Sequence, residues 1–461
     1  MRKSVLVSAY YSLQQVTRRL LPKRVKDLLN RIFIPLRSPP PILDDWDIGL
    51  VGGSPIIWPC THWTERPEAT HLVQPRTRCL LLTESLDSSG MDEFVAFLAR
   101  RLPEQGITTA VLLDAECPNW REGKLASALK NEGISVFSAT SRDGGHTIAK
   151  WSPNVIYSHS ASTWPLVYAQ EQNIAALEAL HGMHNVFGRS SEELAKRRRL
   201  LRRIIAVSES VRIQYLHRDA EAHPGFIVTI PNGINKTRTS LVDRVAARSA
   251  LGLNDEFLFL SLARHCMQKN TYGLADAFLE FAHKEPRAHL LICGRADDAS
   301  YTQRVLQLRA QGKRQRQLHL RANTERIDVL LSAADAFILN SFFEGWSLAS
   351  MEAFGVGLPA ILADVGGARE QLEGGPPRGV LVSNPLGNPL SVDWTTIAAA
   401  RFGPQQNRIE LISAMAAFVG GNVELASRNE IRAYALDRFN DDRCLRAHAG
   451  VIHELGQQRR F

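Results

Sequence analysis

The chain has 461 residues, of which 44% are hydrophobic and 22% are charged, and its formal net charge at pH 7 is +8. This length is too great for one ordinary core and predicts two domains of comparable size. The sequence contains no run of about 18 apolar residues, which excludes a membrane-spanning helix. Its six cysteines are scattered without a CxxC pair, which argues against a disulfide frame or a zinc site and indicates reduced thiols in a cytoplasmic protein.

The positive charge is concentrated at the start of the chain. Residues 1–37 carry nine Lys or Arg and one acid, Asp27, so the remaining residues balance to zero. Apolar residues recur at helical spacing among the basic ones over 21–36, a pattern typical of a helix on an anionic membrane surface. The same pattern suits a helix packed on the protein's own surface, and both interpretations stay open. A proline-rich linker follows, and we predict a basic extension over residues 1–77.

After this extension, short apolar runs suited to buried strands alternate with amphipathic segments suited to helices. The first series covers 79–85, 91–107, 108–115, 121–132, 134–139, 154–160, 173–180, 192–203, 203–210 and 226–234. The second series covers 257–265, 273–284, 288–295, 316–322, 326–334, 335–341 and 359–367. Such alternation predicts an α/β fold with two doubly wound parallel sheets. We place the two domains at residues 78–235 and 236–430, followed by C-terminal helices over 431–461.

In such sheets ligands bind beyond the carboxyl ends of the strands, so a site is expected in the cleft between the domains. The stretch SFFEGWSLASMEAFGVG places Glu344 and Glu352 around a helix predicted to begin near Ser347. Free N–H groups at that helix start form an anion pocket, and Gly345 lets a phosphate approach. The order of carboxylate, anion pocket and carboxylate matches the sugar, diphosphate and ribose of a nucleotide sugar. A solvated glutamate on a surface helix is the alternative interpretation.

Six segments carry a resemblance to a known family, and two of them are SSGMDEFVAFLARRLPEQGI at 88–107 and RANTERIDVLLSAADAFILNS at 321–341. Residues 344–370, EGWSLASMEAFGVGLPAILADVGGARE, resemble the signature EGFGL…LEAMACGxPVxxxxxGGxxE of retaining GT-B glycosyltransferases of the family 4 kind, or group 1 glycosyltransferases. The segments ALHGMHNVF at 179–187, VTIPNGIN at 228–235 and LARHCMQKN at 262–270 agree with the same family. The resemblance implies two Rossmann-like domains that face each other across a cleft. It also implies that the helices over 431–461 pack back on the first domain.

The resemblance implies a donor site on the second domain. Its residues are Arg264, Lys269, Glu352, Gly345, Trp346, Ser347 and Leu348. Arg264 and Lys269 would hold the diphosphate, Glu352 the ribose and Glu344 the donor sugar. Trp346 and Ser347 replace the Phe and Gly of the family pattern and keep a bulky ring beside a small residue.

The resemblance also implies residues on the acceptor side. His181 lies at a strand end and would face the reaction centre, which makes it a candidate catalytic residue together with Glu344. His159 competes with His181 for this role, and a structural histidine is the alternative for either. Gly90 is expected to shape the acceptor pocket.

The implied reaction moves a sugar from a nucleotide-diphosphate sugar to a hydroxyl of a saccharide acceptor with retention of configuration. No cofactor and no metal are expected, because Arg264, Lys269 and the helix start supply the positive charge for the leaving diphosphate. Asp45 and Asp47 form a DxD match in the linker, and we attribute it to chance. No nucleic-acid partner is expected, since no aromatic residues interleave a basic patch in the rest of the chain.

The basic run KRRRLLRR at 196–203, together with the N-terminal helix, favours a lipid-linked acceptor in bacterial cell-surface polysaccharide synthesis. It would place the protein at the inner face of the cytoplasmic membrane. A solvated helix face explains the run as well. Two other function classes stay open, a GT-B sugar-nucleotide epimerase and a non-catalytic scaffold derived from a glycosyltransferase. The presence of Arg264, Lys269, Glu344 and Glu352 together counts against the scaffold.

Overall fold

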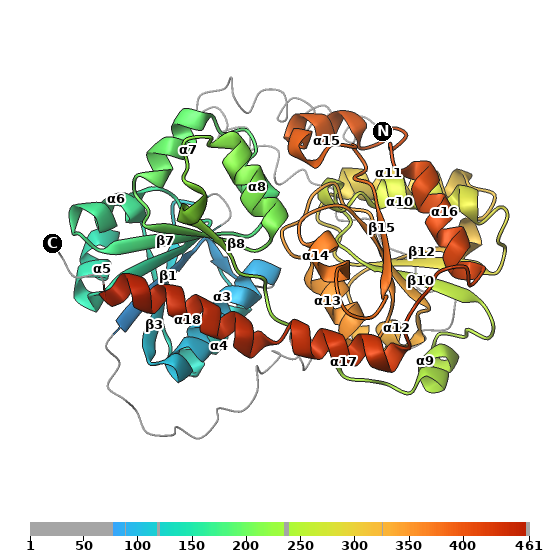
Figure 1. The fold of residues 1–461 in the computed structure, drawn as a ribbon, viewed down its shortest axis with the longest axis horizontal. Helices are drawn as coiled ribbons and strands as arrows, with labels where there is room; N and C mark the ends of the chain where they lie inside the picture. Colours follow the sequence, from blue (N-terminus) through green and yellow to red (C-terminus); the bar gives the residue numbers. More distant parts are fainter. Residues whose placement is uncertain (1–76, 88, 118–119, 235–238, 325, 458–461) are drawn as a thin grey trace.

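The structure is a computed structural model that describes residues 77–87, 89–117, 120–234, 239–324 and 326–457. Within these residues the chain forms two α/β halves that lie side by side (Figure 1). The predicted basic helix and linker of the N-terminal extension lie outside the described residues. No helix in the described part of the chain is long and apolar enough to cross a membrane.

The first half contains a sheet of seven parallel strands in the order β5-β3-β1-β6-β7-β8-β9. Its strands are β1 (Thr77–Thr83), β3 (Ile107–Asp114), β5 (Ser135–Ala139), β6 (Val155–His159), β7 (Ala175–Leu180), β8 (Arg203–Ala206) and β9 (Ile227–Thr229). Its helices are α3 (Gly90–Arg101), α4 (Lys124–Asn131), α5 (Gly144–Trp151), α6 (Trp164–Glu171), α7 (Ser191–Arg198) and α8 (Glu209–Arg218). A short parallel pair, β2 (Ser85–Leu86) with β4 (Arg121–Glu122), lies beside this sheet's loops.

The second half contains a sheet of six parallel strands in the order β12-β11-β10-β13-β14-β15. Its strands are β10 (Phe257–Leu262), β11 (Ala288–Cys293), β12 (Leu318–Arg321), β13 (Ala336–Leu339), β14 (Ala360–Ala363) and β15 (Gly379–Val382). Its helices are α9 (Arg244–Ala250), α10 (Thr271–Phe281), α11 (Ala299–Gln311), α12 (Ile327–Ala333), α13 (Leu348–Gly355), α14 (Ala368–Leu372), α15 (Trp394–Ala400) and α16 (Arg408–Val419). The predicted pair of doubly wound parallel sheets is confirmed.

In both sheets the strand order reverses near the middle, and ligands are expected to bind at such a reversal. The strand order reverses between β1 and β6 in the first sheet and between β10 and β13 in the second. At such a reversal the loops beyond the carboxyl ends diverge and leave a crevice. The strands at these points are buried on both faces, which is why the sequence shows continuous apolar runs there.

The C-terminal chain crosses between the halves (Figure 1). The helix α17 (Arg428–Arg438) packs against α13 of the second half, and α18 (Asp441–Gln457) packs across β1 and β6 of the first. Ile234 lies in the first crossover and donates its N–H to the carbonyl of Phe439, at 2.7 Å. Of the two C-terminal helices predicted to pack on the first domain, α18 does so and α17 lies against the second half.

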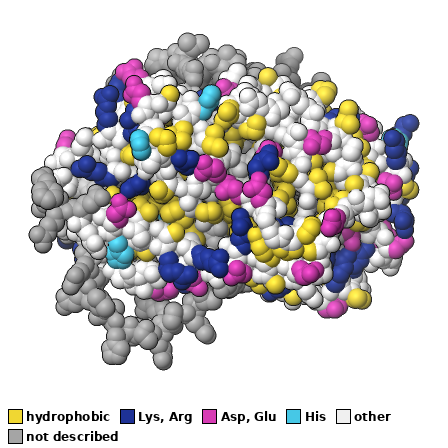
Figure 2. Space-filling view, in the orientation of Figure 1, with side chains coloured by type: hydrophobic (Ala, Val, Ile, Leu, Met, Phe, Trp, Pro, Cys, Tyr) yellow, Lys and Arg dark blue, Asp and Glu magenta, His cyan; other side chains and the backbone are white. Residues whose placement is uncertain are grey.

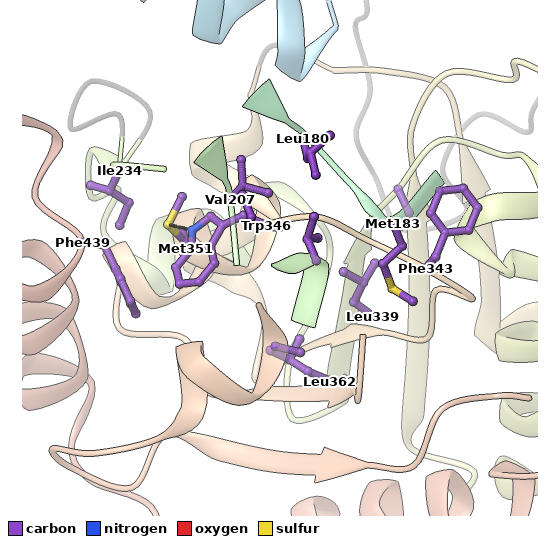
Figure 3. Close-up of a cluster of buried hydrophobic side chains, with 14 of the residues drawn as sticks. Leu180, Met183, Val207, Ile234, Leu339, Phe343, Trp346, Met351, Leu362 and Phe439 are labelled. Carbon is purple, nitrogen blue, oxygen red and sulfur yellow. Dashed lines mark hydrogen bonds between the residues drawn. The ribbon is translucent and has the colours of Figure 1, made fainter. Parts of the chain in front are cut away.

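One apolar core continues from the first half into the second (Figure 3). Leu180, Met183 and Val207 of the first half belong to the same buried cluster as Phe343 and Met351 of the second. The two halves are therefore joined by apolar packing. On the surface, acidic and basic side chains are intermixed over both halves in the view of Figure 2.

Candidate active site

A lysine and a glutamate meet beyond the carboxyl ends of β10 and β13, which are neighbours in the second sheet. Lys269 Nζ donates to Glu344 Oε1 at 2.6 Å, and Ser341 Oγ donates to the same oxygen at 2.6 Å. The Lys269 side chain is only 16% exposed and that of Glu344 only 8%. Each charge is therefore largely desolvated, and each compensates the other.

The helix α13 begins directly beside this ion pair. Ser347 is its N-cap, and the Oγ of Ser347 accepts a hydrogen bond from the N–H of Ser350 at 3.2 Å. The first N–H groups of a helix, here from Leu348 onward, have no carbonyl partner within the helix and attract anions. Glu352 is buried one turn further along α13. The predicted helix start is confirmed. Glu344 lies in the loop before this start, and Glu352 lies within the helix, as predicted.

Arg264 lies two residues beyond the end of β10, with 45% of its side chain exposed. Its guanidinium donates to Asp297 Oδ2 at 2.6 Å and to Gln268 Oε1 at 2.9 Å. Burial raises the pKa of Asp297, but hydrogen bonds from Arg295 and Arg264 outweigh this and hold that pKa below its usual value. Arg264 is thus an exposed cation that two side chains hold in place.

Trp346 takes a different place from the predicted one. Its Nε1 lies 2.7 Å from Met351 Sδ, and its ring packs edge-on against Phe439 at 5.8 Å between ring centroids. Only 6% of the residue is exposed. The ring belongs to the core between the halves (Figure 3), so only the backbone of Trp346 remains for a donor molecule.

The histidines of the first half lie opposite the glutamate loop. His181 follows β7, and the N–H of Met183 points at the carbonyl of Glu344 across 3.5 Å. A Cβ atom on Gly345 would lie only 1.9 Å from the His181 carbonyl oxygen, so the two loops are in direct contact. Burial, and then the charge of His184, lowers the pKa of His181 to about 3. His181 is therefore neutral at physiological pH.

His159 is fully buried at the end of β6, and its Nδ1 lies 2.8 Å from Nε2 of His181. This burial corrects the expectation that His159 competes with His181 for contact with a substrate. A Cβ atom on Gly90 would lie 3.3 Å from Leu348 Cδ1, so Gly90 lies against the start of α13, and its role in an acceptor pocket stays a prediction. The structure thus brings together residues predicted separately on the two halves.

A small polar cavity lies in the first half next to these histidines. Ser160 and Asn185 form one side of it, and Asn185 Oδ1 accepts the N–H of Gly182, the residue after His181, at 3.0 Å. Arg189 lines another part of the cavity, and burial together with the charge of Arg197 lowers its pKa. The cavity therefore lies next to the end of β7, which His181 follows.

The basic run at 196–203 is largely neutralised by neighbouring acids. Arg197 forms a buried ion pair with Glu178, with Nε at 2.8 Å from Oε2. Arg198 Nε donates to Asp219 Oδ2 at 2.7 Å. These contacts favour a structural role for the centre of the run over a free cationic face.

Some residues of the site were not singled out from the sequence. They include Ser341, which binds Glu344, and Gln268 and Asp297, which hold Arg264. Asp297 follows β11 by four residues, and a carboxylate beyond a strand end was the signal that could have identified it. Within the described residues, no group of three or more His, Cys, Asp or Glu side chains is arranged to hold a metal ion.

Two family models match the two halves separately. The model described as Glycosyltransferase Family 4 matches residues 88–238, and that described as Glycosyl transferases group 1 matches residues 243–390. A curated relative, alpha-monoglucosyldiacylglycerol synthase of Acholeplasma laidlawii, is 29% identical over 146 residues. This match covers 30% of the chain and 36% of the relative, so the chain spans about a third of that protein's length.

Solved structures match over most of the chain. The Anabaena protein HepE in complex with UDP has a TM-score of 0.65 at 18% identity, over 82% of this chain and 100% of the other. Sucrose-phosphate synthase of Thermosynechococcus elongatus has a TM-score of 0.61 at 17% identity, over 82% and 99% of the two chains. These TM-scores and coverages support the GT-B fold, and the two family models, over residues 88–238 and 243–390, add the family. The chain is a glycosyltransferase of the group 1, or family 4, kind.

Proposed function

We propose that the protein transfers a sugar from a nucleotide-diphosphate sugar to a hydroxyl of a saccharide acceptor, with retention of configuration. The observation that carries this proposal is the buried Lys269–Glu344 ion pair beside the start of α13. Lys269 and the helix start supply positive charge where a diphosphate leaves, and Arg264 adds a third positive group. Because these groups would offset the charge of the leaving diphosphate, we propose that no metal is required.

The partners follow from the same geometry and from the relatives. Structures of the Anabaena protein HepE contain UDP and UDP-glucose, which supports a uridine nucleotide as the first donor to test. The name of the curated relative is that of a synthase of a glucosylated diacylglycerol, which supports a lipid-linked acceptor. We propose that the acceptor occupies the side of Gly90 and the polar cavity at Ser160 and Arg189. A lipid-linked acceptor would bring the protein to the inner face of the cytoplasmic membrane and would suit synthesis of a cell-surface polysaccharide.

The retaining path would use the acceptor hydroxyl and the leaving diphosphate on one face of the sugar. The carboxylate of Glu344 is already bound by Lys269 and Ser341, which suits a group that holds sugar hydroxyls better than a covalent nucleophile. In this path a diphosphate oxygen takes the acceptor proton, and Lys269 stabilises the charge that develops on the diphosphate.

Calorimetric titration with UDP, GDP and ADP tests the donor site. We expect one of these nucleotides to bind to the wild type and Arg264→Ala to bind it about 10-fold or more weakly, the scale of a lost charged hydrogen bond. Arg287→Ala is the matched control, because Arg287 is 71% exposed and forms its ion pair with Asp255 outside the site. Absence of binding by all three nucleotides would favour the scaffold interpretation over the enzyme.

The two glutamates are expected to separate nucleotide binding from turnover. Glu352→Ala should weaken binding of the free nucleotide diphosphate by about 1–3 kcal/mol, because the ribose hydroxyls would lose their acceptor. Glu344→Ala should leave most nucleotide binding intact and lower kcat with the sugar donor. Calorimetry and turnover of both variants check this assignment, and equal loss of nucleotide binding in the two variants would contradict it.

A further inference from the structure

The carboxyl ends of β6 and β7 hold two neutral histidines in one hydrogen bond. His159 Nδ1 and His181 Nε2 are 2.8 Å apart, so one hydrogen lies between them. Burial lowers the pKa of His159 well below its usual value, with His181 and His448 adding to the effect, and the pKa of His181 is about 3. A neutral imidazole carries one hydrogen, so either ring could be the donor.

The surroundings of His159 decide between the two assignments. Its other nitrogen, Nε2, is buried and has no hydrogen-bond partner within the described part of the chain. Aromatic rings enclose the imidazole, with Tyr157 at 4.2 Å and Phe94 at 6.2 Å between centroids. A hydrogen on Nε2 would be a buried, unpaired N–H group, which folded proteins rarely tolerate. A hydrogen on Nδ1 is used in the bond to His181.

We propose that His159 carries its hydrogen on Nδ1 and donates it to Nε2 of His181, which forces the hydrogen of His181 onto Nδ1. His159 is then a positioning residue that touches no substrate and fixes the tautomer and orientation of its neighbour. The tautomer stands independently of the proposed function, while its catalytic consequence rests on that function. With Nε2 occupied, His181 offers reactants a hydrogen-bond donor at Nδ1 and no basic nitrogen.

The second half contains a matched pair of histidines. His289 Nδ1 lies 3.0 Å from His319 Nε2, the same combination of nitrogens. His289 and His319 are the second residues of β11 and β12, near the amino ends of these strands. The candidate active site lies beyond the opposite ends, so this pair serves as a control for the loss of a part-buried bond between histidines.

Nitrogen-15 spectra of the histidine-labelled full chain at pH 7 test the tautomer. The His181 signals are identified by their loss in His181→Gln. We expect the wild type to show His181 protonated on Nδ1, and His159→Leu to abolish this fixed state in favour of a mixture of tautomers. His289→Leu should leave the His181 signals unchanged. A hydrogen on Nε2 in the wild type, or an unchanged His181 spectrum in His159→Leu, overturns the proposal.

Turnover gives a second readout where sugar transfer is measured. His159→Leu should lower kcat about 10- to 100-fold, the range known for removal of the outer partner of a metal-ligating histidine, with donor KM unchanged. His159→Asn should recover a large part of the wild-type kcat, because the asparagine amide N–H can donate from near the position of Nδ1. Equal loss in both variants, or no loss in His159→Leu, counts against the positioning role. A wild type without transfer activity refutes the proposed function and leaves the spectroscopic result to decide the tautomer.

Discussion

Lys269→Met should lower sugar transfer about 100-fold or more and lower the free energy of unfolding by about 3–5 kcal/mol, the cost of leaving one member of a buried ion pair alone. Among the described residues, Glu344 Oε1 would retain the Ser341 hydroxyl as its partner, in a place where the Glu344 side chain is 8% exposed. The stability loss comes from the uncompensated carboxylate. The activity loss, about 100-fold or more, comes from the missing positive charge at the diphosphate.

A double variant separates the two roles of the lysine. Lys269→Met combined with Glu344→Gln removes both charges, so it should recover most of the stability but none of the activity. Lys196→Met is the control for loss of a lysine, because Lys196 pairs with Glu192 on an exposed helix face and should cost at most about 0.5 kcal/mol. Wild-type turnover in the single variant would refute the assignment of Lys269 to the donor site.

The sequence pattern predicted the sheets and the loops that carry the site because both depend on local signals. The strands around the site are continuous apolar runs, and the turn beyond β13 is marked by Glu344 and Gly345. The contact between Lys269 and Glu344 depends instead on β10 lying next to β13, although 75 residues separate the two side chains. No spacing in the sequence indicates that β10 and β13 are neighbours, so the ion pair could not be predicted without the structure.

His159 and Trp346 lie in different surroundings from those predicted, because elements distant in the sequence bury their side chains. His159 lies at a strand end, where a functional histidine is common. Its ring is buried, however, with Phe94 of α3 and His448 of α18 nearby. Trp346 occupies a loop position expected to line the donor pocket, but Phe439 draws its ring into the core between the halves. In both cases the residue that covers the ring is far away in the sequence, so the local sequence pattern could not predict this burial.

Gly345→Ala should lower turnover about 100-fold or more while each half stays folded. A Cβ atom at this position would lie 1.9 Å from the His181 carbonyl oxygen and 2.6 Å from its carbonyl carbon. Both atoms are backbone at the end of a buried strand, so they cannot move aside without displacing β7. The halves must then separate at the cleft, and a shift of about 1 Å between reacting groups is enough for a loss of this size.

Nucleotide binding distinguishes this separation from a damaged donor site. The residues assigned to the diphosphate, Arg264 and Lys269, lie on the second half, so calorimetry should show binding of the nucleotide largely retained in Gly345→Ala. Small-angle scattering should show a larger radius of gyration. Gly182→Ala is the closest control, since its Cβ would lie 2.7 Å from the His184 side chain, which can rotate away, and 3.5 Å from the Gly345 nitrogen, an ordinary van der Waals contact. If Gly345→Ala kept both wild-type turnover and wild-type dimensions, the contact between His181 and the glutamate loop would not be what closes the site.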